Sequence, residues 1–207
     1  GMKVYDTQAI RNVAFVGHSS SGKTTLVDAL AFSAGSSRRH GTIQEGTTLT
    51  DYTPDEIDRK HSIGLALAYA EWMDTKLNFI DAPGYLDFLG EATTALHTAD
   101  AAVVVVSAVS GVEVGTEKVW EICDHLHLPR IIFVSQMDKE RADFERVFDN
   151  VKAHLSPKVV PVEIPVGNGP DFHGIINLLT GTTHYYKKGT KAGEYDEGPM
   201  PDEYKET

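Results

Sequence analysis

Apolar and β-branched runs alternate with helical patterns along most of this 207-residue chain. The run at 101–106 is continuously apolar, which is typical of a strand buried on both faces. The pattern predicts strands at 13–16, 65–72, 77–80, 101–106, 130–134 and 159–166. It predicts helices near 24–34, 86–97, 115–126 and 139–155. Such alternation indicates an α/β fold in which right-handed crossovers build a mostly parallel sheet between layers of helices.

Two stretches interrupt this alternation. Residues 35–62 are polar and dotted with glycine, and they are too many for a simple connector. This segment is therefore either a functional loop or a disordered one. From residue 186 onward the chain is polar and carries no core pattern. We therefore expect a domain over 1–185 and a tail over 186–207 that begins an inserted subdomain.

The first motif with chemical meaning follows the first predicted strand. Residues 17–24 match the pattern G-x-x-x-x-G-K-[ST]. The glycines let backbone N–H groups approach a phosphate at a helix N-terminus, where Lys23 would neutralise β and γ oxygens and Thr24 would bind Mg²⁺. The alternative, a glycine-rich turn with a solvated lysine, does not explain why a strand precedes the loop and a helix follows. The predicted phosphate-binding residues are Gly17, His18, Ser19, Ser20, Ser21, Gly22, Lys23, Thr24 and Thr25.

A second motif ends the predicted strand at 77–80. Asp81 begins the segment Asp-Ala-Pro-Gly, which fits the pattern D-x-x-G. An aspartate in this place can hold Mg²⁺ through water, and the N–H of Gly84 can sense a γ-phosphate. By itself the segment could be a simple turn, but behind a phosphate loop it indicates a nucleotide-dependent switch.

The composition of the chain argues against several classes of protein. The chain has 19 Lys and Arg against 30 Asp and Glu, a formal net charge of −11, which argues against a domain held to nucleic acid by its bulk charge. The longest apolar run is far shorter than the roughly 20 residues of a membrane helix. No charged-then-apolar leader opens the sequence, and Cys123 is its one cysteine. We therefore expect a cytoplasmic protein without internal disulfides.

With these motifs, the sequence resembles the nucleotide-binding domain of the translational GTPases, above all the elongation factor G family and its elongation-factor-G-like branch. The resemblance extends from residue 13 to about 186 and includes 41–51, 86–88, 111–115, 133–138 and 172–176. It implies a P-loop domain that binds GTP or GDP with Mg²⁺, hydrolyses GTP, and engages the ribosome through the intact protein. A monomer that binds neither membranes nor specific DNA sequences is expected.

The resemblance also assigns residues. It makes the loop 35–62 the first switch, which would become ordered only around a nucleoside triphosphate. Ser62 stands nineteen residues before Asp81, where the family has a metal-binding threonine, and its hydroxyl can still bind Mg²⁺. The implied metal ligands are Thr24, Ser62 and Asp81. The implied catalytic residues are Lys23, Gly84 and the residue that follows it.

Three departures from the family pattern bear on activity. Tyr85 stands where the family has its catalytic histidine, and a neutral phenol cannot replace an imidazolium, so we expect slow intrinsic hydrolysis. Ser19 and His61 occupy positions that are apolar in relatives. His61 could replace the missing histidine, although a solvated loop histidine is the favoured interpretation.

The third departure lies in the guanine motif N-K-x-D, which reads Ser135-Gln136-Met137-Asp138 here. Asp138 keeps the carboxylate that would accept from the guanine N1–H and 2-amino groups. Ser135, Gln136 and Asp138 complete the predicted nucleotide-binding set, and a further guanine-contacting loop of the family is not in this sequence. Two alternatives stay open: a nucleotide-gated ribosome-binding module with negligible hydrolysis, which Tyr85 favours, and an ATP-using P-loop protein, which Ser135 and Gln136 favour.

Overall fold

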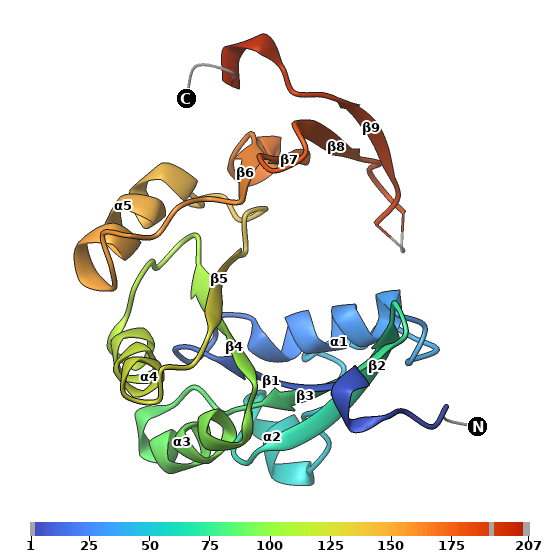
Figure 1. The fold of residues 1–207 in the computed structure, drawn as a ribbon, viewed down its shortest axis with the longest axis vertical. Coiled ribbons are helices and arrows are strands. Elements are labelled where there is room, and N and C mark those ends of the chain that lie inside the picture. The colour runs from blue at the N-terminus through green and yellow to red at the C-terminus, as the bar shows by residue number, and fades with distance from the viewer. Residues whose placement is uncertain (1–2, 191–192, 205–207) are drawn as a thin grey trace. The chain divides into compact units, whose positions relative to one another are not determined.

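The computed structural model describes residues 3–190 and 193–204. The chain divides into two compact units. The first unit comprises Gly1–Val106 and Glu113–Ser135, and the second comprises Ser107–Val112 and Gln136–Thr207. Each unit has its own sheet, and the elements of both are labelled in Figure 1.

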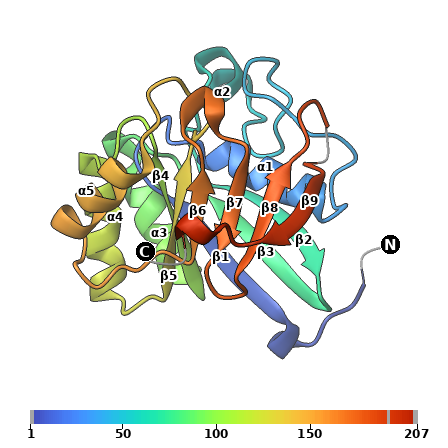
Figure 2. The same ribbon diagram turned by 90° about the horizontal axis from the view of Figure 1, so that it is seen from above.

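The first unit is built on a five-stranded sheet in the order β2-β3-β1-β4-β5. Its central strand β1 runs parallel to β3 and β4, whereas β2 is antiparallel to β3. Figure 2 shows β2, β3 and β1 following one another across this sheet. The strands are β1 (Ile10–Val16), β2 (Ala66–Trp72), β3 (Thr75–Asp81), β4 (Ala101–Ser107) and β5 (Arg130–Ser135). This arrangement confirms the predicted α/β fold with a mostly parallel sheet.

Helices cover both faces of this sheet, with α1 on one side and α3 on the other (Figure 1). The side chains between α1 and the sheet come from alternate strand positions, as the period of two requires. This core contains Phe15, Val27, Ala70, Phe79, Val103 and Val105. The helices of the first unit are α1 (Lys23–Ser33), α2 (Pro54–Arg59), α3 (Leu89–Thr98) and α4 (Val114–His125), with 3₁₀ turns at Thr7–Ala9 and Leu86–Phe88.

The register of β1 and β3 brings two motifs together. Phe15 of β1 pairs with Asp81 of β3, so the D-x-x-G segment begins beside the end of the strand that leads into the phosphate loop. Since these strands are parallel, both motifs leave the sheet at the same edge. This edge is where the sequence predicted the nucleotide.

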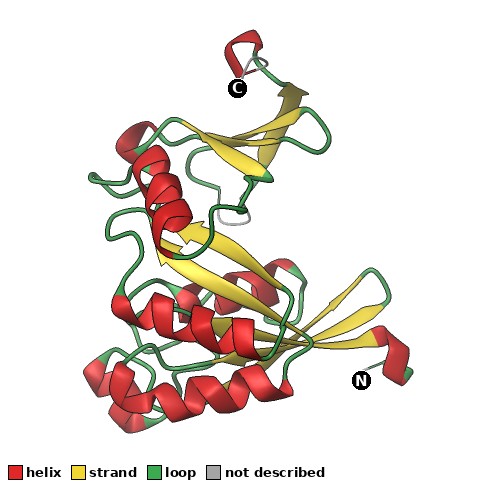
Figure 3. Cartoon of the chain, turned by 60° about the vertical axis from the view of Figure 1, so that its left-hand side comes forward, coloured by secondary structure: helices red, strands yellow, loops and turns green. Residues whose placement is uncertain are grey.

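The second unit carries an antiparallel sheet that the sequence pattern did not predict in full. The order is β6-β7-β8-β9, drawn as yellow strands with the red helix α5 in Figure 3. Ile176 and Thr183 are completely buried in the sheet. The elements are α5 (Phe144–His154), β6 (Glu163–Val166), β7 (Gly174–Asn177), β8 (Thr182–Tyr186) and β9 (Tyr195–Pro199), with 3₁₀ turns at Gly169–Asp171 and Asp202–Tyr204.

Several predicted boundaries in this part of the chain were wrong. The helix predicted from 139 begins at Phe144, because the Asp143 side chain accepts the Arg146 N–H and caps the first turn. The strand predicted at 159–166 forms only at Glu163–Val166. Strand β9 lies within the predicted polar tail and exists through its pairing with β8. Residues 191–192 and 205–207 of that tail lie outside the described residues, and the division at residue 185 stays a prediction.

Among the described residues, no helix is both long enough and apolar enough to cross a membrane.

Candidate nucleotide-binding site

The loop 17–24 connects β1 directly to α1. Gly17 has φ 143° and Gly22 has φ 93°, backbone conformations that favour glycine. A Cβ on Gly17 would overlap the carbonyl oxygen of Val105. The loop therefore needs glycine at both ends, and α1 begins within it at Lys23. The phosphate contacts of its N-terminal N–H groups stay a prediction. Within it Ser21 is buried, whereas Ser20 and Thr25 are exposed.

Lys23 is a buried cation at the beginning of α1. It is 6% exposed, and its Nζ donates to the carbonyl oxygen of His18 at 2.7 Å. Burial lowers the pKa of Lys23 to about 8, although the nearby carboxylates of Asp81 and Asp51 oppose that shift. Gly84 lies against this ammonium so closely that a Cβ would overlap Nζ. Two of the three predicted catalytic residues, Lys23 and Gly84, are therefore adjacent in space.

The three predicted metal ligands also meet. The Thr24 hydroxyl donates to Asp81 Oδ2 at 2.8 Å, and Ser62 Oγ lies 3.1 Å from Thr24 Oγ1. Two further residues join this cluster that the sequence-based reasoning missed. Thr50 donates to the same Asp81 oxygen at 2.6 Å, and Asp51 Oδ1 accepts from Ser62 at 2.6 Å. Thr50 and Asp51 are neighbours with side-chain oxygens in the loop 35–62, which also contains the predicted metal ligand Ser62. That pattern could have identified them from the sequence.

The cluster has unused acceptor capacity. Asp81 is 1% exposed and Asp51 is 4% exposed. Asp81 Oδ1 and Asp51 Oδ2 are buried atoms for which the described part of the chain provides no hydrogen-bond partner. Burial raises the pKa of Asp81 to about 6 against the hydrogen bonds from both threonines, and burial also raises the pKa of Asp51. Orphaned carboxylate oxygens beside hydroxyls are a donor set that suits a hard divalent cation such as Mg²⁺.

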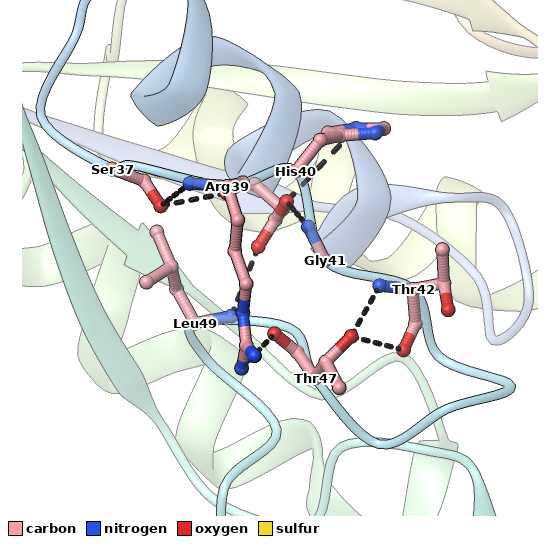
Figure 4. A network of polar contacts seen from close by, with 8 residues as sticks. Ser37, Arg39, His40, Gly41, Thr42, Thr47 and Leu49 are labelled. Atoms are coloured by element: carbon pink, nitrogen blue, oxygen red, sulfur yellow. Dashed lines mark hydrogen bonds and ion pairs between the residues drawn. The ribbon is translucent and has the colours of Figure 1, made fainter. Parts of the chain in front are cut away.

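The loop 35–62 is folded rather than structureless, and its first part is held by one carboxylate of α1. Asp28, 1% exposed, accepts the N–H of Gly41 at 2.6 Å through Oδ2 and the N–H of Leu49 at 3.0 Å through Oδ1. Figure 4 shows these bonds with those of Thr42 and Thr47, which close a turn between the two anchored amides. Whether this segment responds to a triphosphate stays a prediction.

The second part of the same loop contains the short helix α2. Thr53 and Glu56 form a reciprocal capping box at its N-terminus, which explains why a helix missed by periodicity forms here. The buried Glu56 carboxylate also accepts the N–H groups of Ile63 and Gly64, at 3.1 and 3.3 Å. Glu56 therefore holds the segment that follows Ser62 in place.

Tyr85, the third predicted catalytic residue, contacts the first switch. Its ring lies 4.5 Å from that of His61, centroid to centroid, at an interplanar angle of 51°. Tyr85 is 40% exposed, and His61 is half-buried. The structure thus brings together two of the departures from the family pattern that are 24 residues apart.

The predicted base-recognition residues fall in different units. Ser135 ends β5, and its hydroxyl donates to the Ser21 carbonyl at 2.6 Å, so it braces the phosphate loop. Gln136 belongs to the second unit, where its Oε1 accepts from Ser107 Oγ at 2.7 Å. Asp138 is an exposed residue of that unit. The guanine contacts of these residues stay predictions.

His18 has a structural role that the motif does not reveal. Its Nδ1 accepts the N–H of Gly115 at 3.2 Å, and its Nε2 lies 3.6 Å from a carboxylate oxygen of Glu113. Both residues lie at the N-terminal end of α4, where Glu113 is the capping residue. The phosphate loop is therefore tied to α4 as well as to β5.

Comparison with known proteins agrees with this geometry. The family model for the elongation factor Tu GTP binding domain matches residues 8–196. Elongation factor G of Granulibacter bethesdensis is 32% identical over 99% of this chain and 30% of its own length. Elongation factor G of Mycoplasma pneumoniae is 35% identical over the same shares. A crystal structure of a protein from Thermus thermophilus matches 96% of this chain and 29% of that one, with 38% identity and a TM-score of 0.87.

The chain spans about 30% of the length of the elongation factor G relatives that it matches. The family match, in contrast, covers nearly all of it, including both motifs that meet at the sheet edge. The prediction of a GTP-binding domain of the elongation factor G type is thereby confirmed. This chain belongs to the family of elongation factor Tu GTP binding domains, and elongation factor G is among its relatives.

Proposed function

We propose that this GTP-binding domain binds GTP with Mg²⁺ and hydrolyses it to GDP as part of a larger, monomeric, cytoplasmic factor that acts on the ribosome. The observation that carries the proposal is the buried ammonium of Lys23, which lies against Gly84 and shares its surroundings with Asp81. The Lys23 ammonium donates to a neutral carbonyl oxygen. An anion bound beside such a buried cation would stabilise it strongly. Phosphate oxygens beside Lys23 would supply that anion.

Mg²⁺ fits the oxygen cluster at the same edge of the sheet. Thr24, Ser62 and Asp81 would hold it, with Thr50 and Asp51 close by, since two of the carboxylate oxygens lack partners within the described residues. When bound, Mg²⁺ would neutralise charge that develops on the β and γ phosphate oxygens. The family of the chain supports guanine as the base, and the Asp138 carboxylate is the residue we assign to it. Ser135 would act on the phosphate loop instead.

The rate of GTP hydrolysis should depend on the residue that follows Gly84. Tyr85 follows Gly84 directly and has a phenol instead of an imidazole, so we propose that hydrolysis by this factor alone is slow and that the ribosome accelerates it. The rival function is a nucleotide-gated ribosome-binding module with negligible hydrolysis, and Tyr85 is the residue that favours it. Phosphate release by the intact protein, with and without ribosomes, distinguishes the two functions. No release above background in the presence of ribosomes would favour the rival.

Lys23→Ala tests the phosphate site itself. Loss of the buried charge should weaken GTP binding at least about tenfold, or about 1.4 kcal/mol, in titration calorimetry with the intact protein. Lys118→Ala is the matched control, because Lys118 is a surface lysine of α4 that pairs with Glu121. Equal GTP affinity of Lys23→Ala and the parent would reject the phosphate assignment. The same titration with ATP tests the base, and equal affinity for ATP and GTP would favour the ATP-using alternative.

A further inference from the structure

His61 packs against the ring of Tyr85, whereas a solvated loop histidine would be surrounded by water. The imidazole lies 4.5 Å from the phenol ring, and its exposure is intermediate although both neighbouring elements are loops. Aromatic pairs at such a distance and tilt attract one another beyond the area that they bury, by roughly 0.5–1.5 kcal/mol. Residue 61 is therefore held against residue 85 by its ring.

The backbone of His61 is held as well. Its N–H donates to the carbonyl oxygen of Glu56 at 3.3 Å, at the end of α2. On the other side, the hydroxyl of Ser62 is bonded to Asp51 and lies beside Thr24 in the oxygen cluster. These contacts hold the backbone on both sides of the residue whose ring packs on Tyr85.

The hydrogen bond of the ring defines which nitrogen is free to act. His61 Nδ1 lies 3.3 Å from the carbonyl oxygen of Ser62. Since a carbonyl oxygen can only accept, Nδ1 carries the hydrogen in this contact. In the neutral ring Nε2 then has its lone pair available to accept a hydrogen bond from a water molecule.

The pair stands where the reaction would take place. Tyr85 follows Gly84 directly, and Gly84 lies against the Lys23 ammonium that would face the β and γ phosphates. Resting on the proposed function, we infer that His61 is a further catalytic residue: its Nε2 accepts a hydrogen bond from the water that attacks the γ-phosphorus, and the ring of Tyr85 positions it. In that step the water oxygen forms a bond to the γ-phosphorus while the bond to the β–γ bridging oxygen breaks. The bridging oxygen leaves on GDP with the electron pair. One proton of the water stays on the oxygen now bonded to phosphorus, and the other passes to a γ-phosphate oxygen, so both leave with the phosphate.

Two substitutions separate the hydrogen bond from the ring contact. His61→Phe keeps a ring against Tyr85 but cannot bond water, whereas His61→Gln keeps an acceptor. Single-turnover hydrolysis by the intact protein on ribosomes, at saturating GTP, measures the rate. The dissociation constant for a fluorescent GTP analogue measures binding separately. His97→Phe is the matched control, because His97 is an exposed histidine of α3.

We expect His61→Phe to lower the hydrolysis rate at least about tenfold while the dissociation constant changes less than about twofold. His61→Gln should retain more of the rate than His61→Phe, and His97→Phe should match the parent. A rate for His61→Phe within about twofold of the parent would overturn the inference. So would equal losses in both variants together with a dissociation constant raised more than about tenfold, because His61 would then act in binding. A parent that binds no GTP analogue would instead refute the proposed function.

Discussion

The anchoring of the first switch by Asp28 can be tested by removing one carboxylate. Asp28→Ala leaves the N–H groups of Gly41 and Leu49 without the buried oxygens that they meet at 2.6 and 3.0 Å. A hydrogen bond to a charged group contributes about 1.5–3 kcal/mol, and the low end applies because a surface loop can admit water. Loss of two bonds at about 1.5 kcal/mol each should therefore lower the free energy of opening of this loop by about 3 kcal/mol in Asp28→Ala.

Amide hydrogen exchange measures that opening directly. Since about 1.4 kcal/mol corresponds to a tenfold change, peptides covering 41–49 should exchange on the order of a hundredfold faster in Asp28→Ala. Peptides from β1 and β4 should exchange as in the parent, because their bonds lie within the sheet. Asp58→Ala is the control, since Asp58 is an exposed carboxylate of α2 in the same loop.

Two results would refute this reasoning. Unchanged exchange over 41–49 in Asp28→Ala would mean that the two bonds to Asp28 do not hold the loop. Equally accelerated exchange in every part of the first unit would mean that Asp28 supports the whole unit rather than its switch. In either case the turn shown in Figure 4 would not be a separately anchored element.

Two further predictions concern Asp81 and Ser135. The pKa of Asp81, about 6 in the folded chain, lies above the value of about 3.9 expected when unfolded, so the folded state keeps a proton that the unfolded state loses between those values. Without Mg²⁺, the free energy of unfolding in urea should therefore fall by on the order of 3 kcal/mol as pH rises from about 4 to 6. Asp81→Asn should remove this contribution and leave only that of Asp51, whose pKa burial also raises. An identical pH profile in the variant would contradict the assignment. Ser135→Ala removes a buried donor to the Ser21 carbonyl, so GTP and ATP affinities should both decrease by up to about tenfold in competition binding. A loss confined to GTP would show instead that Ser135 contacts the base.

The sequence could predict those elements whose apolar positions are also the positions buried in the folded chain. Strand β4 is apolar at every position from Ala101 to Val106 because both of its faces are covered. The helix α2 could not be found from periodicity, since six residues are too few, and it depends on the Thr53–Glu56 capping box. Strand β9 has little apolar character of its own, so only its pairing with β8 makes it a strand.

The sequence by itself determined the phosphate loop, the D-x-x-G segment and the strand–helix order that carries them. These depend on residue type at short spacing: glycine where φ is positive, lysine and a hydroxyl at the beginning of a helix, aspartate at the end of a buried strand. Only the tertiary structure decided which loop residues meet them. Thr50 reaches Asp81, Asp28 anchors Gly41, and His61 packs on Tyr85 across separations that local periodicity does not encode. The physical reason is that these contacts form only after the loops have closed over the folded sheet. Which groups then contact a buried carboxylate or ring depends on the path of the whole chain.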